Sequence, residues 1–186
     1  MITGWLLSAE DFVKMPDRPS RALAKKLMDT QNPRNDTPNQ QVLQSLREAL
    51  QGRATGLWRL EGAYLRLVGF APAPDLDATI AEAFVTATRA VRLDQLALGI
   101  VKAFVTRQPA ISRTLELPPE VGSGYWLRAF GATRSVAVPL LSANAGEPPL
   151  GVLSIALGDA PEDSVVCDRA IAYGLRLERS EGTVAP

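Results

Sequence analysis

Histidine is absent from all 186 residues of this sequence, and cysteine occurs once, at Cys167. Without histidine, the Ser-His-Asp and Cys-His arrangements of nucleophilic catalysis are impossible. Zinc and iron sites that use histidine are excluded too, and one thiol forms no thiolate cluster. We therefore expect no metal site and no enzymatic activity. One cysteine also forms no internal disulfide, which is typical of proteins in a reducing compartment.

The sequence also lacks long hydrophobic runs and an excess of either charge. No apolar run approaches the roughly 18–20 residues that a membrane-spanning helix requires. The start, Met1 to Trp5, lacks the basic-then-apolar order of a signal peptide, so we expect a cytoplasmic protein. Twenty basic residues balance twenty acidic ones, which removes the general attraction to phosphate that most nucleic-acid-binding proteins use. We expect neither a nucleic acid nor a membrane as partner.

The residues that are present suit one compact domain with an extension. Apolar residues make up 46% of the chain and charged residues 22%, which is ordinary globular usage and enough to form a core. Residues 1–38 contain several prolines that interrupt short helical patterns, so we predict an extension of short helices and linker there. The main domain is predicted over residues 39–179, and residues 180–186 are predicted to be a disordered tail.

Capping signals and apolar spacing predict the first elements of the main domain. Thr37-Pro38-Asn39-Gln40 is typical of a helix start, and Gly52 is placed to end that helix in a left-handed conformation. Residues 55–60 and 63–70 are predicted to form a hairpin. Asp77 is predicted to cap a helix whose apolar face runs from Ile80 to Val91. Asp94 is predicted to cap the next helix, which ends at Gln108-Pro109.

The second half of the chain is predicted to contain more strands than helices. Residues 110–115 are predicted as a strand, 117–124 as a flexible loop and 125–130 as a short helix. Two apolar runs within Ser135–Leu157 flank a turn-rich loop, which is typical of a β-hairpin. An amphipathic helix is predicted from Asp163. This order indicates an α+β domain with a mainly antiparallel sheet.

Several of these segments resemble those of GAF domains. Pro139 closes the first run of the predicted hairpin, and Leu150-Gly151-Val152-Leu153 opens the second, as in that family. Residues 98–111, with their terminal Gln108-Pro109, resemble the family's helix and following strand, and residues 127–135 resemble its approach to the next strand. The resemblance covers roughly residues 39–179. It implies a GAF/PAS-like sheet with helices packed on one face and a lid of short helix and loop on the other.

In families with this fold, a small molecule is typically held between one sheet face and the helices and loops opposite it. The resemblance places the corresponding lid at residues 109–131. Aromatic rings beside guanidinium groups can hold a planar or anionic ligand, whereas Tyr125 and Trp126 could equally be core packing and Arg134 a surface ion-pair partner. The candidate ligand-binding residues are Tyr125, Trp126, Arg128, Arg134, Trp58 and Ser154.

Departures from the family's ligand-binding subclasses lead us to expect no cofactor. The cysteine-histidine pair used to attach bilins and the axial histidine of haem proteins are both absent. One thiol cannot form the intramolecular disulfide needed by members that reduce free methionine sulfoxide. A cyclic-nucleotide signature of the Asn-Lys-Phe-Asp-Glu type is also missing.

Three functions remain open at the level of sequence. The first is a non-enzymatic regulatory module that binds a small molecule and signals through its terminal helices to a downstream signalling protein, with homodimerisation through those helices. The second is a structural or interaction module whose pocket is filled by Trp58, Phe104 and Trp126. A carboxylate-dependent enzyme that uses Asp75 or Glu116 is a distant third.

Overall fold

The computed structural model describes residues 38–120, 122–142, 144 and 146–182. Its centre is a six-stranded sheet in the order β3-β2-β1-β6-β5-β4, and every neighbouring pair is antiparallel. The predicted extension at residues 1–37 and the Thr37 cap lie outside the described residues. The strands are β1 (Ala54–Glu61), β2 (Tyr64–Pro72), β3 (Ala90–Arg92), β4 (Ala110–Arg113), β5 (Arg134–Leu140) and β6 (Gly151–Leu157).

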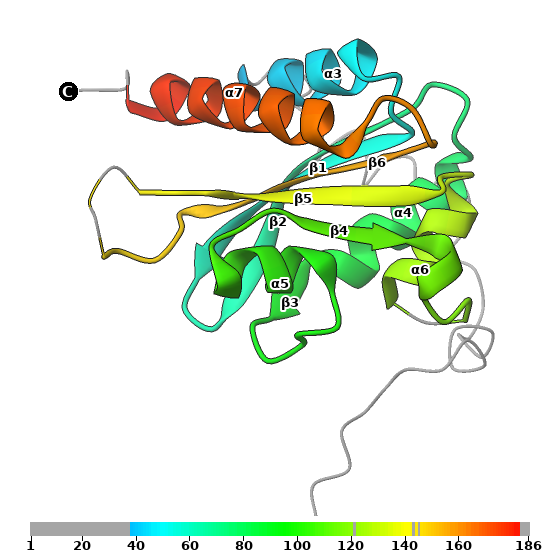
Figure 1. The fold of residues 1–186 in the computed structure, drawn as a ribbon, viewed down its shortest axis with the longest axis horizontal. Coiled ribbons are helices and arrows are strands. Elements are labelled where there is room, and N and C mark those ends of the chain that lie inside the picture. Colours follow the sequence, from blue (N-terminus) through cyan, green and yellow to red (C-terminus); the bar gives the residue numbers. More distant parts are fainter. Residues whose placement is uncertain (1–37, 121, 143, 145, 183–186) are drawn as a thin grey trace, which may run out of the picture. The chain divides into compact units, whose positions relative to one another are not determined.

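Helices cover both faces of this sheet. One face carries α3 (Pro38–Ala49) and α7 (Asp163–Gly182), which lie side by side above the strands in Figure 1. The opposite face carries α4 (Ala78–Thr88), α5 (Gly99–Thr106) and α6 (Gly122–Ala129). A 3₁₀ turn, η1, spans Thr114–Glu116. The predicted α+β fold with a mainly antiparallel sheet is confirmed.

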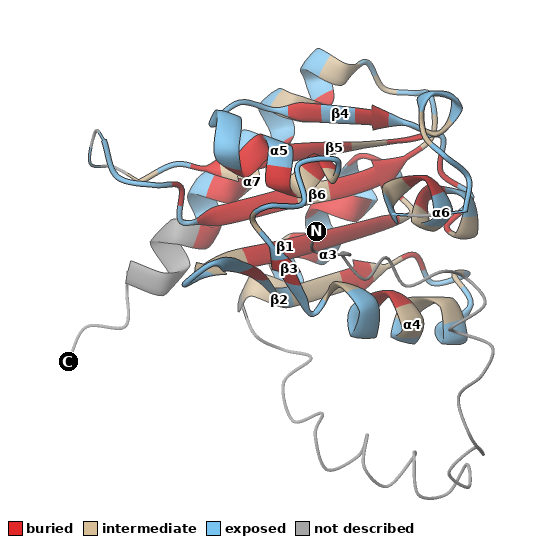
Figure 2. Cartoon of the chain, turned by 90° about the horizontal axis from the view of Figure 1, so that it is seen from below, coloured by how far each residue is buried: buried red, intermediate tan, exposed pale blue. Residues whose placement is uncertain are grey.

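Each sheet face has its own hydrophobic cluster, because successive side chains of a strand point to opposite faces. The first cluster joins α3 and α7 to residues such as Leu57, Val136 and Leu153. The second joins α4, α5 and α6 to residues such as Trp58, Ala137 and Val152. Figure 2 shows that the central strands β1, β5 and β6 are buried along most of their length. The sheet is therefore an internal layer between two sets of helices.

Both predicted hairpins are confirmed, and several predicted helix and strand ends are wrong. Val91 lies on strand β3 opposite Leu65, not on the helix that Asp77 caps. Asp94 does not cap α5, because its carboxylate pairs with Arg92. The helix starts five residues later, with Leu98 at the N-cap position. Strand β4 ends at Arg113, two residues before its predicted end.

Other local predictions are wrong because tertiary contacts determine the conformation of these segments. The left-handed residue after α3 is Gln51, with φ of 51°, and not Gly52. Gly52 is needed for space instead, since a Cβ atom there would lie 2.8 Å from Ile155 Cδ1. The segment 122–124 is the first turn of α6 and not a flexible loop. Helix α7 continues to Gly182, past the predicted start of the tail at residue 180, and residues 183–186 lie outside the described residues.

Candidate functional site

The candidate site is the layer between the sheet and helices α4, α5 and α6, where the fold implied by the sequence would hold a ligand. Phe84, on the buried side of α4, is at its centre. Its ring centroid lies 6.3 Å from that of Trp58, 4.9 Å from Phe70, 5.3 Å from Trp126 and 5.1 Å from Phe130. Edge-to-face and tilted rings at these separations stabilise one another beyond simple burial. The layer is therefore occupied by a connected aromatic cluster.

Trp58 covers the central part of the sheet in this layer. It reaches this face by the regular alternation of β1, which keeps its register against β6, whereas the bulge in the β1–β2 ladder places its extra residue, Val68, on β2. The indole lies along its own strand over Gly56, where an added Cβ atom would be only 2.5 Å from Cη2 of the indole. Only 2% of Trp58 is exposed. Its Nε1 donates to the carbonyl of Thr88 at 3.2 Å, so its polar edge is also satisfied.

Residues with small side chains form the sheet surface next to the indole. Gly56 is paired with Ser154 across the β1–β6 ladder, and Ser154 is paired with Ala137 across the β5–β6 ladder. Because cross-strand partners share a sheet face, the three residues form one row. Ala137 is buried, whereas Ser154 is half-buried. Of the predicted site residues, Trp58 and Ser154 therefore do lie on the same face and near each other.

Helix α6 holds the predicted lid residues, but they divide into different roles. Trp126 is half-buried against the aromatic cluster, while the neighbouring Tyr125 is 45% exposed. Arg128 points at the backbone of its own lid. It donates to the carbonyls of Gly124 at 2.9 Å, Thr114 at 2.5 Å and Leu117 at 3.4 Å. These contacts give Arg128 a structural role, fixing η1 and the following loop to α6.

Arg134 is not beside the aromatic residues. It starts β5 in the alternation that points Val136 and Val138 into the cluster under α3 and α7, so its side chain is on the opposite sheet face. Its Nη1 donates to Asp163 Oδ1 at 2.5 Å, and its Nη2 contacts the carbonyl of Pro161. The predicted pairing of Arg134 with Trp126 across a ligand is wrong. Arg134 instead anchors the beginning of α7.

The titratable groups near this layer serve structure. Asp75 lies in the loop after β2 and accepts two hydrogen bonds of 2.9 Å from Arg53, which holds the pKa of that carboxyl below its usual value. Arg53 Nε also donates to the Phe130 carbonyl. Oε1 of Glu116 lies 3.9 Å from Nε of Arg113. A carboxyl whose pKa is lowered in this way, as at Asp75, is a poor general acid.

The described residues form no candidate metal centre, and their one thiol is half-buried. Within the described ranges, no three or more His, Cys, Asp or Glu residues are grouped so that they could hold a metal ion. Cys167 is on α7, away from the aromatic cluster, and burial raises the pKa of its thiol. A raised pKa lowers the thiolate fraction and therefore the reactivity of this cysteine.

Two hollows of the surface lie elsewhere. One, of about 270 Å³, is between the end of α3 and the start of α7 and includes Leu50, Pro161 and Arg169. The other, of about 190 Å³, is beside α7 and β5 and includes Leu140, Ile171 and Leu175. Neither is lined by Trp58, Ser154 or Trp126. Both hollows therefore lie beside α7, on the side of the sheet away from the aromatic cluster.

Sequence reasoning missed the residues that organise the site. Phe84 was identified only as one apolar position of a helix, and Phe70 and Phe130 only as strand and helix members. Gly56 carried a signal, because a glycine inside a strand often marks a close approach of another group. The sequence does not say which group approaches, since the Trp58 indole lies over Gly56 in contact with Phe84 and the Thr88 carbonyl, both distant in sequence.

No family model matches the sequence, and no curated protein matches it. Solved structures do match the fold. The GAF domain region of a protein from Geobacter sulfurreducens superimposes with a TM-score of 0.54 at 14% identity, covering 85% of this chain and 99% of that one. The GAF domain/HD domain protein from Geobacter sulfurreducens gives a TM-score of 0.52 at 14% identity, with 76% and 90% covered.

A third neighbour is the red/green cyanobacteriochrome NpR6012g4 in its red-light-absorbing state. Its TM-score is 0.52 at 14% identity, and the match covers 78% of this chain and 95% of the other. In the part of the chain that the structure describes, no helix has the length and apolar character needed to cross a membrane. The antiparallel six-stranded sheet, the helices on both of its faces and these superpositions agree: this chain has the fold of a GAF domain.

Proposed function

We propose that this chain is a non-enzymatic regulatory module that acts through protein contacts, with its sheet–helix layer filled by its own side chains. The observation that carries the proposal is the aromatic cluster around Phe84, in which Trp58 lies directly over Gly56. Burial of several rings at van der Waals distance stabilises the layer as a core. The GAF fold supports a regulatory role, since one neighbour's name describes a light-absorbing protein. We further propose a cytoplasmic location, in keeping with the single cysteine.

Helix α7 is the contact surface that we favour. The outward positions of α3 are polar, for example Gln41, Gln44 and Glu48. Those of α7 include Ile171 and Leu175, which are four residues apart and about half exposed. Residues at this spacing lie on one stripe of a helix. A second copy of the chain would cover this stripe, and the homodimer would transmit a change to a downstream signalling protein.

A small-molecule ligand is the second candidate function. Ser154 and Trp126 favour it, because both are half-buried on the side of the sheet where the fold would hold a ligand. Tyr125, exposed on α6 beside Trp126, would be the outer contact. In this case a bound molecule would shift the equilibrium between two arrangements of the module only if it binds them with different affinity.

The test is native mass spectrometry of the purified protein, followed by a thermal-shift screen of nucleotides, amino acids and organic acids. The proposed function predicts the mass of a dimer with no additional mass and no reproducible shift. A retained molecule, or a shift that saturates with concentration, would establish the ligand-binding alternative, since ligand bound to the folded state raises stability by mass action. A monomeric mass at all concentrations would remove the dimer.

A further inference from the structure

The position of Trp58 has the features of a bound ligand and not only those of a core side chain. One local feature makes room for the ring, the missing side chain at Gly56, while β1 itself keeps a regular register against β6. With any Cβ at residue 56, Cη2 and Cζ3 of the indole would be at 2.5 and 2.6 Å, distances that require something to shift. The outer edge of the six-membered ring therefore occupies the space that a side chain at residue 56 would need.

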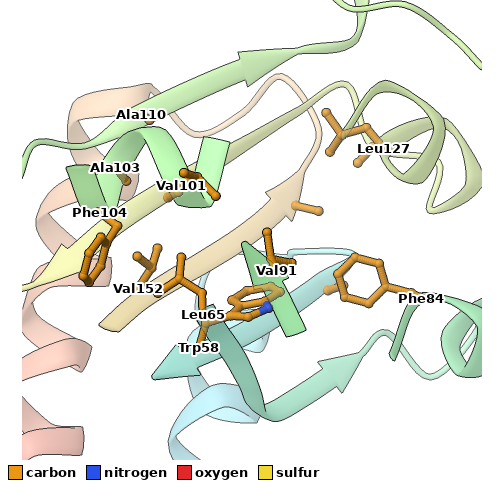
Figure 3. Packing of buried hydrophobic residues seen from close by; sticks show 14 of the residues in the cluster. Trp58, Leu65, Phe84, Val91, Val101, Ala103, Phe104, Ala110, Leu127 and Val152 are labelled. Carbon is orange, nitrogen blue, oxygen red and sulfur yellow. The ribbon is translucent and has the colours of Figure 1, made fainter. Parts of the chain in front are cut away.

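The surroundings of the indole are specific for a flat ring with one donor at its edge. Phe84 meets it edge-to-face, with an interplanar angle of 86°. Figure 3 shows Leu65 and Val91 beside the ring, both of them buried residues of the same cluster. The Thr88 carbonyl accepts from Nε1. Apolar walls with one well-placed polar group are the usual composition of a site for a small planar molecule.

The row of small residues continues across the sheet beyond the ring. Ser154 and Ala137 extend the row that begins at Gly56, and neither carries a large side chain. Ser154 is half-buried, so the row is reached by solvent at this point. Loss of the indole would leave a hollow next to small side chains, and apolar hollows of this type can take up aromatic molecules.

We propose that Trp58 is a built-in ligand: it occupies a site for a planar bicyclic heteroaromatic molecule with one N–H donor, and this site accepts such a molecule only when the Trp58 side chain is removed. The inference rests on the proposed function in one respect, the filled layer. It deepens that function by stating which side chain closes the site and which chemical class the closed site fits. The wild-type chain is then independent of ligand at this face.

The test is complementation of W58A with free indole, measured by thermal shift and by isothermal titration calorimetry. Indole should raise the melting temperature of W58A in a saturable manner and leave the wild type unchanged. The matched control is W126A, which removes the same side chain from the half-buried edge of the same cluster and should not respond. Benzofuran, which has an oxygen in place of the N–H group, should bind W58A roughly tenfold more weakly, because the Thr88 carbonyl would lose its donor.

Three results would overturn the proposal: a folded W58A that does not bind indole, an equal response of W126A, or saturable binding of indole to the wild type. If W58A does not fold alone, refolding with and without indole is followed by near-ultraviolet circular dichroism, and W58L is examined in the same way. Recovery that depends on indole supports the proposal, and failure of both variants to respond contradicts it. Sedimentation of the wild type tests the proposed dimer separately, so the two can fail independently.

Discussion

Gly56 shows how one missing side chain shapes the candidate site. A Cβ atom at residue 56 would overlap the Trp58 ring, so G56A should lower the free energy of unfolding by about 1–3 kcal/mol, the usual cost of overpacking a core. Urea denaturation measures this loss. The matched control is G158A, because no atom lies within 4 Å of a Cβ atom built there. The same substitution should cost less in a W58A background, and equal costs in both backgrounds would contradict the contact.

Asp77 provides the prediction on pH dependence. Its carboxylate caps α4 by accepting from the backbone N–H groups of Thr79 at 2.7 Å and Ile80 at 3.2 Å, and these bonds lower the pKa of the carboxyl in the folded state. A lowered folded-state pKa means that the stabilisation is present above the unfolded pKa, about 3.9, and is lost as the pH falls through the folded pKa. D77A should therefore melt below the wild type at neutral pH, with a difference that shrinks below about pH 4.

The control for this prediction is D77N. Asparagine is also a good N-cap but does not titrate, so D77N should keep most of the stability at neutral pH and lose less on acidification. Melting temperatures of the three proteins between pH 2 and 7 test the mechanism. A difference between wild type and D77A that does not change with pH would show that the charged form of the cap contributes nothing.

At the scale of elements, the start of α7 is fastened to the sheet by a mostly buried ion pair. The Arg134 side chain is 5% exposed and the Asp163 side chain 23%. D163A would leave the guanidinium of Arg134 buried without its carboxylate, which costs about 3–5 kcal/mol in comparable buried pairs. Urea denaturation measures the loss, and hydrogen exchange should become faster in the first turns of α7.

Arg113 supplies the matched control, because it contacts the same carboxylate from β4 but is 44% exposed. Exposed ion pairs contribute about 0–1 kcal/mol, so R113A should cost far less than D163A. Similar losses for R113A and D163A would mean that burial of Arg134 does not determine the strength of this anchor.

At the scale of the whole molecule, substitutions in the exposed stripe of α7 test the proposed homodimer. I171E and L175E each place a charge on the proposed contact surface and should convert the dimer to a monomer in sedimentation velocity experiments, without lowering the melting temperature of the monomer. V68E is the control, because Val68 is equally exposed but lies on β2. A dimer that survives I171E and L175E would exclude this face of α7 as the interface.

Much of the fold follows from sequence signals that act locally. Pro38 at the start of α3, the Asp77 cap, the apolar runs in β1 and β6, and the apolar spacing of α7 are each local signals, and each predicted its element. Strand β3 was missed because its three residues follow α4 almost directly and share its apolar pattern. Its extended conformation depends on pairing with β2, and no local sequence signal indicates that pairing.

The sequence by itself determined the kind of chemistry available to this protein: the lack of histidine, the lone cysteine and the balanced charges are facts of composition. It also determined which residues are aromatic, but not where the rings meet. Tertiary structure alone decided that Arg134 faces α7, that Arg128 is bound to carbonyls of its own lid, and that Trp58 lies over Gly56. The physical reason is that strand register sets the sheet face of Arg134, and packing in the folded layer sets the positions of Arg128 and Trp58; both depend on residues distant in sequence.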